Sequence, residues 1–303
     1  MARVVLLAGG TGGAKLARGM LDVADDLTVV ANTGDDVEMY GAHVSPDPDL
    51  VSFWLADRID ERGWGLRDDT FAVMDGLREL GDDVWLNLGD RDLAVCLRRA
   101  RRLAEGATLT EAIAEQCAAL GVAARVLPMS DAPVRTFVMA DGEWWPFQDF
   151  MIRRGGEGPV GGVDLRGADA ARPTEAVLEA IAGADVIVVG PSNPIVSIGP
   201  ILAVPGLRQA LAAAAAPVVA VSPIVRGQVL KGPTEAFLGW AGHDATGAGV
   251  LDHYGTLLNG FVADERIDDT PVPLLVTDVD MSDAAGRERV AGETLRFAQS
   301  LAR

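Results

Sequence analysis

The chain has 303 residues, of which 49% are hydrophobic and 23% charged, and this composition is typical of a soluble globular protein with one large or two ordinary domains. Its 26 basic and 44 acidic residues give a net charge of −18, which argues against nucleic acid or anionic lipid as a partner. A small anionic ligand is still compatible with this charge, because a divalent metal ion can bridge two anions.

The two cysteines, Cys96 and Cys117, have neither the number of a disulfide scaffold nor the spacing of metal ligands. We expect both to be reduced thiols. Met1 runs almost directly into a strand-like segment without a separate apolar region, so no signal peptide is predicted. The most apolar later stretch, 210–221, is shorter than a membrane span of ~20 residues and contains Pro217. The sequence therefore predicts a cytoplasmic protein without a membrane partner.

Short valine-rich runs alternate along the chain with helical patterns. The nearly uniform apolarity of these runs is typical of strands buried on both faces, as in a parallel sheet. The predicted strands are Val4–Ala8, Leu27–Ala31, Val186–Val189 and Val218–Val221. The predicted helices are Ala14–Ala24, Thr70–Leu80, Leu93–Ala104, Leu109–Leu120, Thr174–Ala182 and Leu207–Ala215.

This alternation predicts a Rossmann-like, doubly wound α/β fold with a mostly parallel sheet and helices on both faces. No linker or internal repeat interrupts the pattern, so a single domain over residues 1–303 is the simplest organisation. Insertion or lid segments are expected near 151–170, where 155–162 holds five glycines, and near 227–253, where the insertion is expected to be helical.

A glycine-rich segment follows the first predicted strand and contains Gly9, Gly10, Thr11, Gly12, Gly13 and Lys15. Such a segment lets the backbone approach a ligand closely, and a helix starting near Ala14 would present free N–H groups to a phosphate. The match to a dinucleotide fingerprint is incomplete, because Lys15 stands where the third glycine belongs. A glycine-rich turn without a ligand is the alternative.

Acidic residues follow the second predicted strand, and others lie within a proline-rich segment further along the chain. Asn32, Asp35 and Asp36 stand where a Rossmann fold binds a ribose, and they could instead organise a metal ion. In the following Ser45-Pro46-Asp47-Pro48-Asp49, prolines fix the backbone, and on an extended segment Asp47 and Asp49 would point the same way, as suits Mg²⁺. Solvated acids at a helix start or in a turn are the alternatives.

Polar segments also follow later strand-like runs. Asn87, Asp90 and Asp92 follow the apolar run 84–86, and they form either a salt-bridged turn or part of a pocket. Ser192 and Asn193 follow the third strand, and Ser222 follows the fourth. Because the carboxyl ends of parallel strands share one edge of a sheet, these segments are expected to converge on one site. No nucleophile–base signature is present, which favours positioning and electrostatics, as in metal-assisted phosphoryl transfer.

In these motifs the chain resembles the 2-phospho-L-lactate transferase (CofD/FbiA) family of coenzyme F420 biosynthesis. The resemblance extends from Leu7 to about Gly227 and is weaker in the C-terminal quarter. The matching stretches are LAGGTGGAKLARG (7–19), VVANTGDD (29–36), HVSPDPDLV (43–51), RGWGLRDDTF (62–71), LNLGDRDLA (86–94), VLPMSDAPVRTFV (126–138), PFQDF (146–150), GPSNPIVSIGPIL (190–202) and VAVSPIVRG (219–227).

The resemblance implies a Mg²⁺-dependent transferase that acts on two substrates and forms a homodimer. The donor would be a guanosine diphosphate ester of lactate or enolpyruvate, with the identity of the three-carbon acid left open. The acceptor would be the deazaflavin Fo, whose ribityl hydroxyl displaces GMP to give F420-0 or its dehydro form.

The resemblance also implies roles for residues. Gly9 to Gly13 and Lys15 would hold the diphosphate, Asn32 and Asp35 the sugar or metal, and Ser192 and Asn193 the nucleotide. Asp49 and Asn87 match positions that contact Fo. Some members carry a basic residue at the position of Asn87. Asp36 and Asp49 are the expected catalytic residues and Mg²⁺ ligands, and Asp49→Asn is expected to abolish turnover while the fold stays intact. Cys96 stands where many members carry histidine.

Two other classes of function compete with this interpretation. A non-catalytic nucleotide-sugar-binding regulator of the YvcK-like branch shares the glycine-rich loop and the Asp-Asp segment, but it continues into Gly-Gly-Ser where this chain has Val37 and Glu38. An NAD-dependent oxidoreductase is suggested by Gly10-x-Gly12 and weakened by Lys15. Binding of Fo would distinguish the transferase from both.

Overall fold

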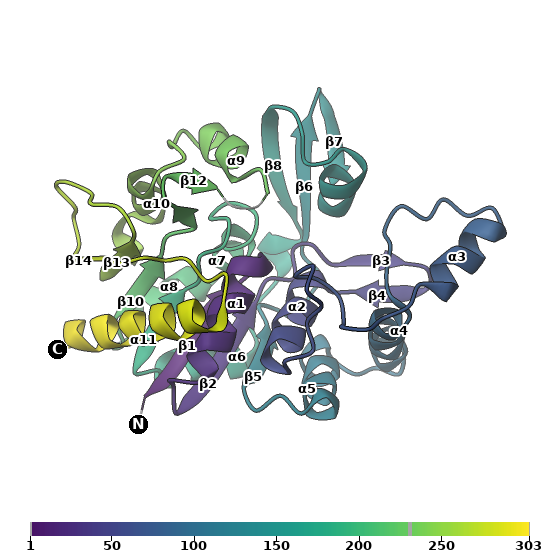
Figure 1. Ribbon diagram of the computed structural model, residues 1–303, viewed down its shortest axis with the longest axis horizontal. Coiled ribbons are helices and arrows are strands. Elements are labelled where there is room, and N and C mark those ends of the chain that lie inside the picture. Colours follow the sequence, from purple (N-terminus) through teal and green to yellow (C-terminus); the bar gives the residue numbers. More distant parts are fainter. Residues whose placement is uncertain (1, 230–231, 303) are drawn as a thin grey trace.

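The computed structural model describes residues 2–229 and 232–302, and these form a central seven-stranded sheet in the order β14-β13-β10-β9-β1-β2-β5 (Figure 1). Every neighbouring pair in this sheet is parallel. The strands are β1 (Arg3–Ala8), β2 (Asp26–Ala31), β5 (Arg125–Pro128), β9 (Val186–Val189), β10 (Val218–Val221), β13 (Gly260–Ala263) and β14 (Leu274–Val276). The chain builds outward from β1 to β5 and then returns to the other side of β1, so the strand order reverses between β1 and β9.

Helices cover both faces of the sheet, because successive side chains of each buried strand point to opposite faces. In β1, Val4 and Leu6 belong to one apolar core, and Val5 and Leu7 belong to the other. The first core is covered by α1 (Gly10–Leu21), α2 (Pro46–Leu55), α5 (Leu109–Leu120) and α11 (Ala284–Leu301). The second is covered by α6 (Glu175–Gly183), α7 (Gly199–Ala203), α8 (Leu207–Ala213) and α10 (Gly247–Tyr254).

Among the described residues, two of the three smaller sheets project from the central layers (Figure 1). The hairpin of β3 (Val37–Met39) and β4 (Ala42–Val44) lies beside α3 (Ala72–Glu79) and α4 (Asp90–Ala104), and the apolar cluster beneath the hairpin includes Val44, Met74 and Cys96. An antiparallel sheet in the order β7-β6-β8 projects at the top of the view in Figure 1. Its strands are β6 (Arg135–Ala140), β7 (Glu143–Pro146) and β8 (Val160–Arg166).

The remaining elements are short. They are the π-helix η1 (Asp149–Arg153), the 3-10 helices η2 (Ala168–Ala170) and η3 (Gly255–Leu257), the strands β11 (Ile224–Val225) and β12 (Gln228–Val229), and α9 (Thr234–Trp240). No described helix combines the length and the apolarity that crossing a bilayer requires.

The doubly wound α/β fold is confirmed, and the four predicted strands lie side by side at its centre. Some predicted boundaries were wrong. The run 84–86 forms no strand, and Asn87 and Asp90 therefore follow a loop. Residues 160–162 of the predicted glycine loop belong to β8, where the absence of a side chain at Gly162 makes room for the ring of Trp144. The segment 227–253 contains α9 and most of α10.

Candidate functional site

A cavity of about 540 Å³ lies at the carboxyl edge of the sheet, beside the point where the strand order reverses. Ligands of doubly wound folds bind at this switch point. The predicted convergence of the strand ends is confirmed, because segments that follow β1, β2, β9 and β10 line the cavity together. Its lining includes Gly9, Gly10, Thr11, Gly12, Lys15, Asp35, Ser192, Asn193 and Ser222.

The glycines after β1 make close contacts with the segment after β9. Helix α1 begins at Gly10 rather than near Ala14, so the glycine run forms its first turn. A Cβ atom on Gly12 would lie 2.0 Å from the carbonyl oxygen of Pro191, and one on Gly13 would lie 2.8 Å from Ser192 Oγ. Glycine is therefore required at these two positions by protein packing. The first turn still offers N–H groups that no intrahelical carbonyl satisfies.

Buried carboxylates lie next to this turn. Asp47 Oδ1 accepts a hydrogen bond of 2.5 Å from the N–H of Gly10, and its Oδ2 accepts one of 2.9 Å from Asn32 Nδ2. The same amide nitrogen also donates to Asp35. Burial raises the pKa of Asp47 to about 6, and burial together with the charges of Asp47 and Asp36 raises the pKa of Asp35 well above its ordinary value.

Asp49 has different hydrogen-bond partners from Asp47. The predicted extended segment is wrong: Pro46–Leu55 forms α2, and residues two apart on a helix point in different directions. Asp49 Oδ1 accepts hydrogen bonds from Arg99 and from Gln116 Nε2 (2.8 Å). Arg99, 2% exposed, also donates to the His43 carbonyl at 2.9 Å. Burial alone would lower the pKa of Arg99, but the charge of Asp49 raises it.

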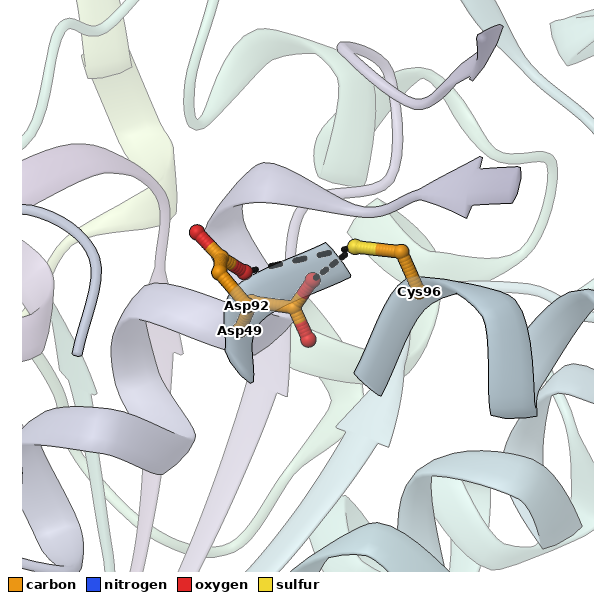
Figure 2. A group of neighbouring side chains, drawn as sticks. All are labelled: Asp49, Asp92 and Cys96. Carbon is orange, nitrogen blue, oxygen red and sulfur yellow. Dashed lines mark hydrogen bonds between the residues drawn. The ribbon is translucent and has the colours of Figure 1, made fainter. Parts of the chain in front are cut away.

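One group of side chains could offer ligand atoms to a metal ion, and it consists of Asp49, Asp92 and Cys96 (Figure 2). A carboxylate oxygen of each aspartate and the Cys96 sulfur lie within 4.8 Å of one another, and the described residues contain no other group of three or more such ligand atoms. The thiol of Cys96 lies 3.8 Å from Asp49 and 4.0 Å from Asp92. Burial raises the pKa of Cys96 well above its ordinary value, so this side chain is a neutral thiol in the described structure. Arg99 pairs with Asp49 in this group, so the charge of that carboxylate is already balanced by a guanidinium.

Asp92 gives this cluster a pH dependence. Burial and then the charge of Asp49 raise the pKa of Asp92 from 3.8 to about 7, so the folded protein binds a proton there that the unfolded chain has lost. Stability from this group is complete below pH ~4 and is lost as the pH rises through about 7, at up to roughly 1.4 kcal/mol per pH unit. We expect the free energy of unfolding of Asp92→Asn to fall less steeply than that of the unmodified protein over this range, measured by urea denaturation. Parallel curves would contradict the assignment.

Asp36, the other predicted catalytic residue, lies at the end of the β3–β4 hairpin. Its Oδ1 accepts a hydrogen bond of 2.7 Å from Ser45 Oγ, and its Oδ2 lies 3.1 Å from His43 Nε2. His43 Nδ1 lies 3.3 Å from Glu38 Oε1. Asp36 and Asp49 thus have separate hydrogen-bond partners, and their catalytic and metal-binding roles remain predictions.

Asn87 and Asp90 lie outside the lining of the main cavity. Asn87 Oδ1 accepts a hydrogen bond of 2.7 Å from Arg78 at the end of α3. Asp90 accepts hydrogen bonds from the N–H groups of Ala72 and Val73, and therefore caps the start of α3. Asp90 is a structural residue here, whereas Asn87 lies beside α3 with no described contact to the glycine turn.

Sequence reasoning missed several residues around the site. A second cavity of about 220 Å³ shares Asp35 and Phe147 with the first and adds residues of β6 and of the segment after β7. In the sequence, the stretches RTFV and PFQDF in these segments matched the family, but nothing indicated that they line a cavity. Residues 279–282, which also line the main cavity, lie where the resemblance is weak.

Comparison with known proteins decides the family. A family model described as 2-phospho-L-lactate transferase CofD matches residues 4–273. The chain belongs to the CofD family. A phosphoenolpyruvate transferase of Kitasatospora aureofaciens is 40% identical over 95% of this chain and 97% of its own length. A 2-phospho-L-lactate transferase of Methanosarcina mazei is 40% identical, with 87% of each chain covered.

The fold of this CofD-family protein also occurs outside its close relatives. The crystal structure of a UPF0052-family protein of Bacillus halodurans superposes with a TM-score of 0.62, covering 97% of this chain and 99% of that one. At 20% identity this likeness concerns the fold alone. Membership of the CofD family supports transferase activity for this protein.

Proposed function

We propose that this CofD-family protein is a transferase of coenzyme F420 biosynthesis. It moves a phospholactyl or phosphoenolpyruvyl group from a guanosine diphosphate ester to the ribityl hydroxyl of the deazaflavin Fo and releases GMP. The observation that carries the proposal is the 540 Å³ cavity at the switch point, where the first turn of α1 meets Ser192 and Asn193. A cavity of this size suits a nucleotide, and a helix start suits its phosphates.

The chain's own residues would divide the work of binding and positioning. The glycine turn and Lys15 would hold the diphosphate, while Ser192 and Asn193 would face the nucleoside. The Asn193 carboxamide oxygen already accepts from the N–H groups of Ile195 and Val196, so its loop is held in place before a ligand binds. Such preorganisation orients the distal phosphorus toward the incoming hydroxyl.

We also propose that the protein binds Mg²⁺, and the carboxylates beside the cavity fit such an ion. No arginine among the described residues pairs with Asp35 or Asp47, and burial, together with neighbouring carboxylates, raises the pKa of both. Carboxylate oxygens are the ligands that Mg²⁺ prefers, so we propose that Asp35 and Asp47 would hold the ion, instead of the Asp36 and Asp49 that the resemblance implied. A bound Mg²⁺ would neutralise charge on the transferred phosphoryl group.

The test is incubation with Fo, Mg²⁺ and each guanylylated acid in turn, followed by mass analysis. We expect F420-0 or its dehydro form together with GMP, and loss of product when the metal is chelated. Absence of product with lactate, enolpyruvate and glycerate donors would contradict the proposed function. Binding of guanine nucleotides without product would instead favour the regulatory alternative.

A further inference from the structure

The second cavity lies beside the main one and is too small for a second large ligand. Its volume is about 220 Å³, and the two cavities share Asp35 and Phe147. Pockets for drug-sized molecules span roughly 300–1,000 Å³, so this cavity suits a fragment of a few heavy atoms. A group bound there would lie directly next to a ligand that fills the main cavity.

One cation faces this small cavity. Arg135, at the start of β6, is the only basic residue in the lining described for it, which also contains Asp35, Asp36 and Glu38. The Arg135 guanidinium donates to Glu38 Oε1 at 2.7 Å and to the Val134 carbonyl at 3.0 Å. The Glu38 side chain is 68% exposed, so it can leave Arg135 without losing a buried environment.

A buried hydroxyl next to Arg135 has no hydrogen-bond partner among the described residues. Thr136, 2% exposed, lines the cavity, and its Oγ1 has no hydrogen-bond partner within the described structure. That hydroxyl lies against the open side of Gly34, 2.7 Å from where a Cβ would stand. Gln148 donates to the Asp35 carbonyl at 3.4 Å. Buried hydroxyls normally find a partner, so the Thr136 hydroxyl is available to a group bound in this cavity.

We infer that the small cavity binds the carboxylate-bearing end of the donor, with Arg135 as its anchor. The inference rests on the proposed function, because it takes the diphosphate to occupy the main cavity. The three-carbon acid then extends past Asp35 and Phe147, and its carboxylate replaces Glu38 on Arg135. An arginine fork matches a carboxylate with two parallel hydrogen bonds, which selects an acid over a neutral group of the same size.

The test compares two ligands that differ only in the acid. Affinities of lactyl-2-diphospho-5′-guanosine and of GDP are measured by calorimetry with Mg²⁺ and without Fo. We expect Arg135→Gln to weaken binding of the ester by ~10-fold or more and to leave GDP affinity unchanged. Glu38→Gln is expected to tighten ester binding by up to about fivefold, because a competing exposed carboxylate is removed. Arg3→Gln is the control, since it removes one exposed charge at the opposite edge of the sheet.

The outcomes separate this inference from the proposed function. If the unmodified protein binds GDP and the ester but Arg135→Gln weakens both equally or neither, the small cavity does not hold the acid. If Arg135→Gln raises only the KM for Fo, the cavity belongs to the acceptor and the inference is overturned. If the unmodified protein binds neither guanine ligand, the proposed function itself fails.

Discussion

Gly12→Ala is expected to abolish transfer and to destabilise the protein. The new Cβ would stand 2.0 Å from the Pro191 carbonyl oxygen and 3.0 Å from its carbon, and both are backbone atoms that cannot rotate away. Overpacking of this kind costs ~1–3 kcal/mol or more. Separation of α1 from the segment after β9 also displaces both walls of the main cavity, and a misplacement of ~1 Å can reduce the rate by about 100-fold. Thermal unfolding and product formation measure the two effects.

Gly76→Ala is the matched control. Gly76 lies within α3, and a Cβ built on it meets no atom within 4 Å. Alanine is a better helix former than glycine by ~0.5–1 kcal/mol, so this variant is expected to unfold at a slightly higher temperature with unchanged turnover. If Gly12→Ala behaved like Gly76→Ala, the close contact between the glycine turn and Pro191 would not exist in solution.

Asp49→Asn is expected to lose stability as well as turnover. The sequence alone led to the expectation of an intact fold, but the structure places Asp49 against a buried guanidinium. Removing one partner of a buried ion pair leaves an uncompensated charge and costs ~3–5 kcal/mol. We therefore expect urea denaturation to show a large fall in the midpoint for this variant, accompanied by little soluble protein.

The double variant Asp49→Asn/Arg99→Gln separates stability from catalysis. It removes both charges, so stability should largely recover and a double-mutant cycle should show strong coupling between the two residues. If the recovered protein still makes no product, the Asp49–Arg99 pair has a role beyond stability. Recovery of turnover together with stability would limit Asp49 to a structural role.

The central sheet was predictable because valine-rich strands buried on both faces can be recognised without knowing their neighbours. Helix α2 was less so, since prolines mark either a turn or the first positions of a helix. Pro46 is in fact the first residue of α2, a position that favours proline.

The buried partner of Asp49 could not be predicted at all. The run 98–102 contains four arginines in an amphipathic helix, and only tertiary contacts with His43, Asp49 and Gln116 single out Arg99. The small cavity was likewise hidden, because β3 and β6 are separated by almost a hundred residues in the chain. Arg135 and Glu38, whose ion pair spans them, carry no local signal of proximity.

The position of α11 has a consequence for how the molecule is made. The start of this last helix packs against α1, the first (Figure 1), and Gly19 approaches the Arg287 carbonyl so closely that a Cβ would lie 2.3 Å from its oxygen. One edge of strand β1 pairs with β9, which lies far along the chain from β1. Contacts this distant along the chain slow folding. That valine-rich edge of β1 therefore stays unpaired until β9 has been synthesised, and unpaired strand edges of this kind are prone to aggregation.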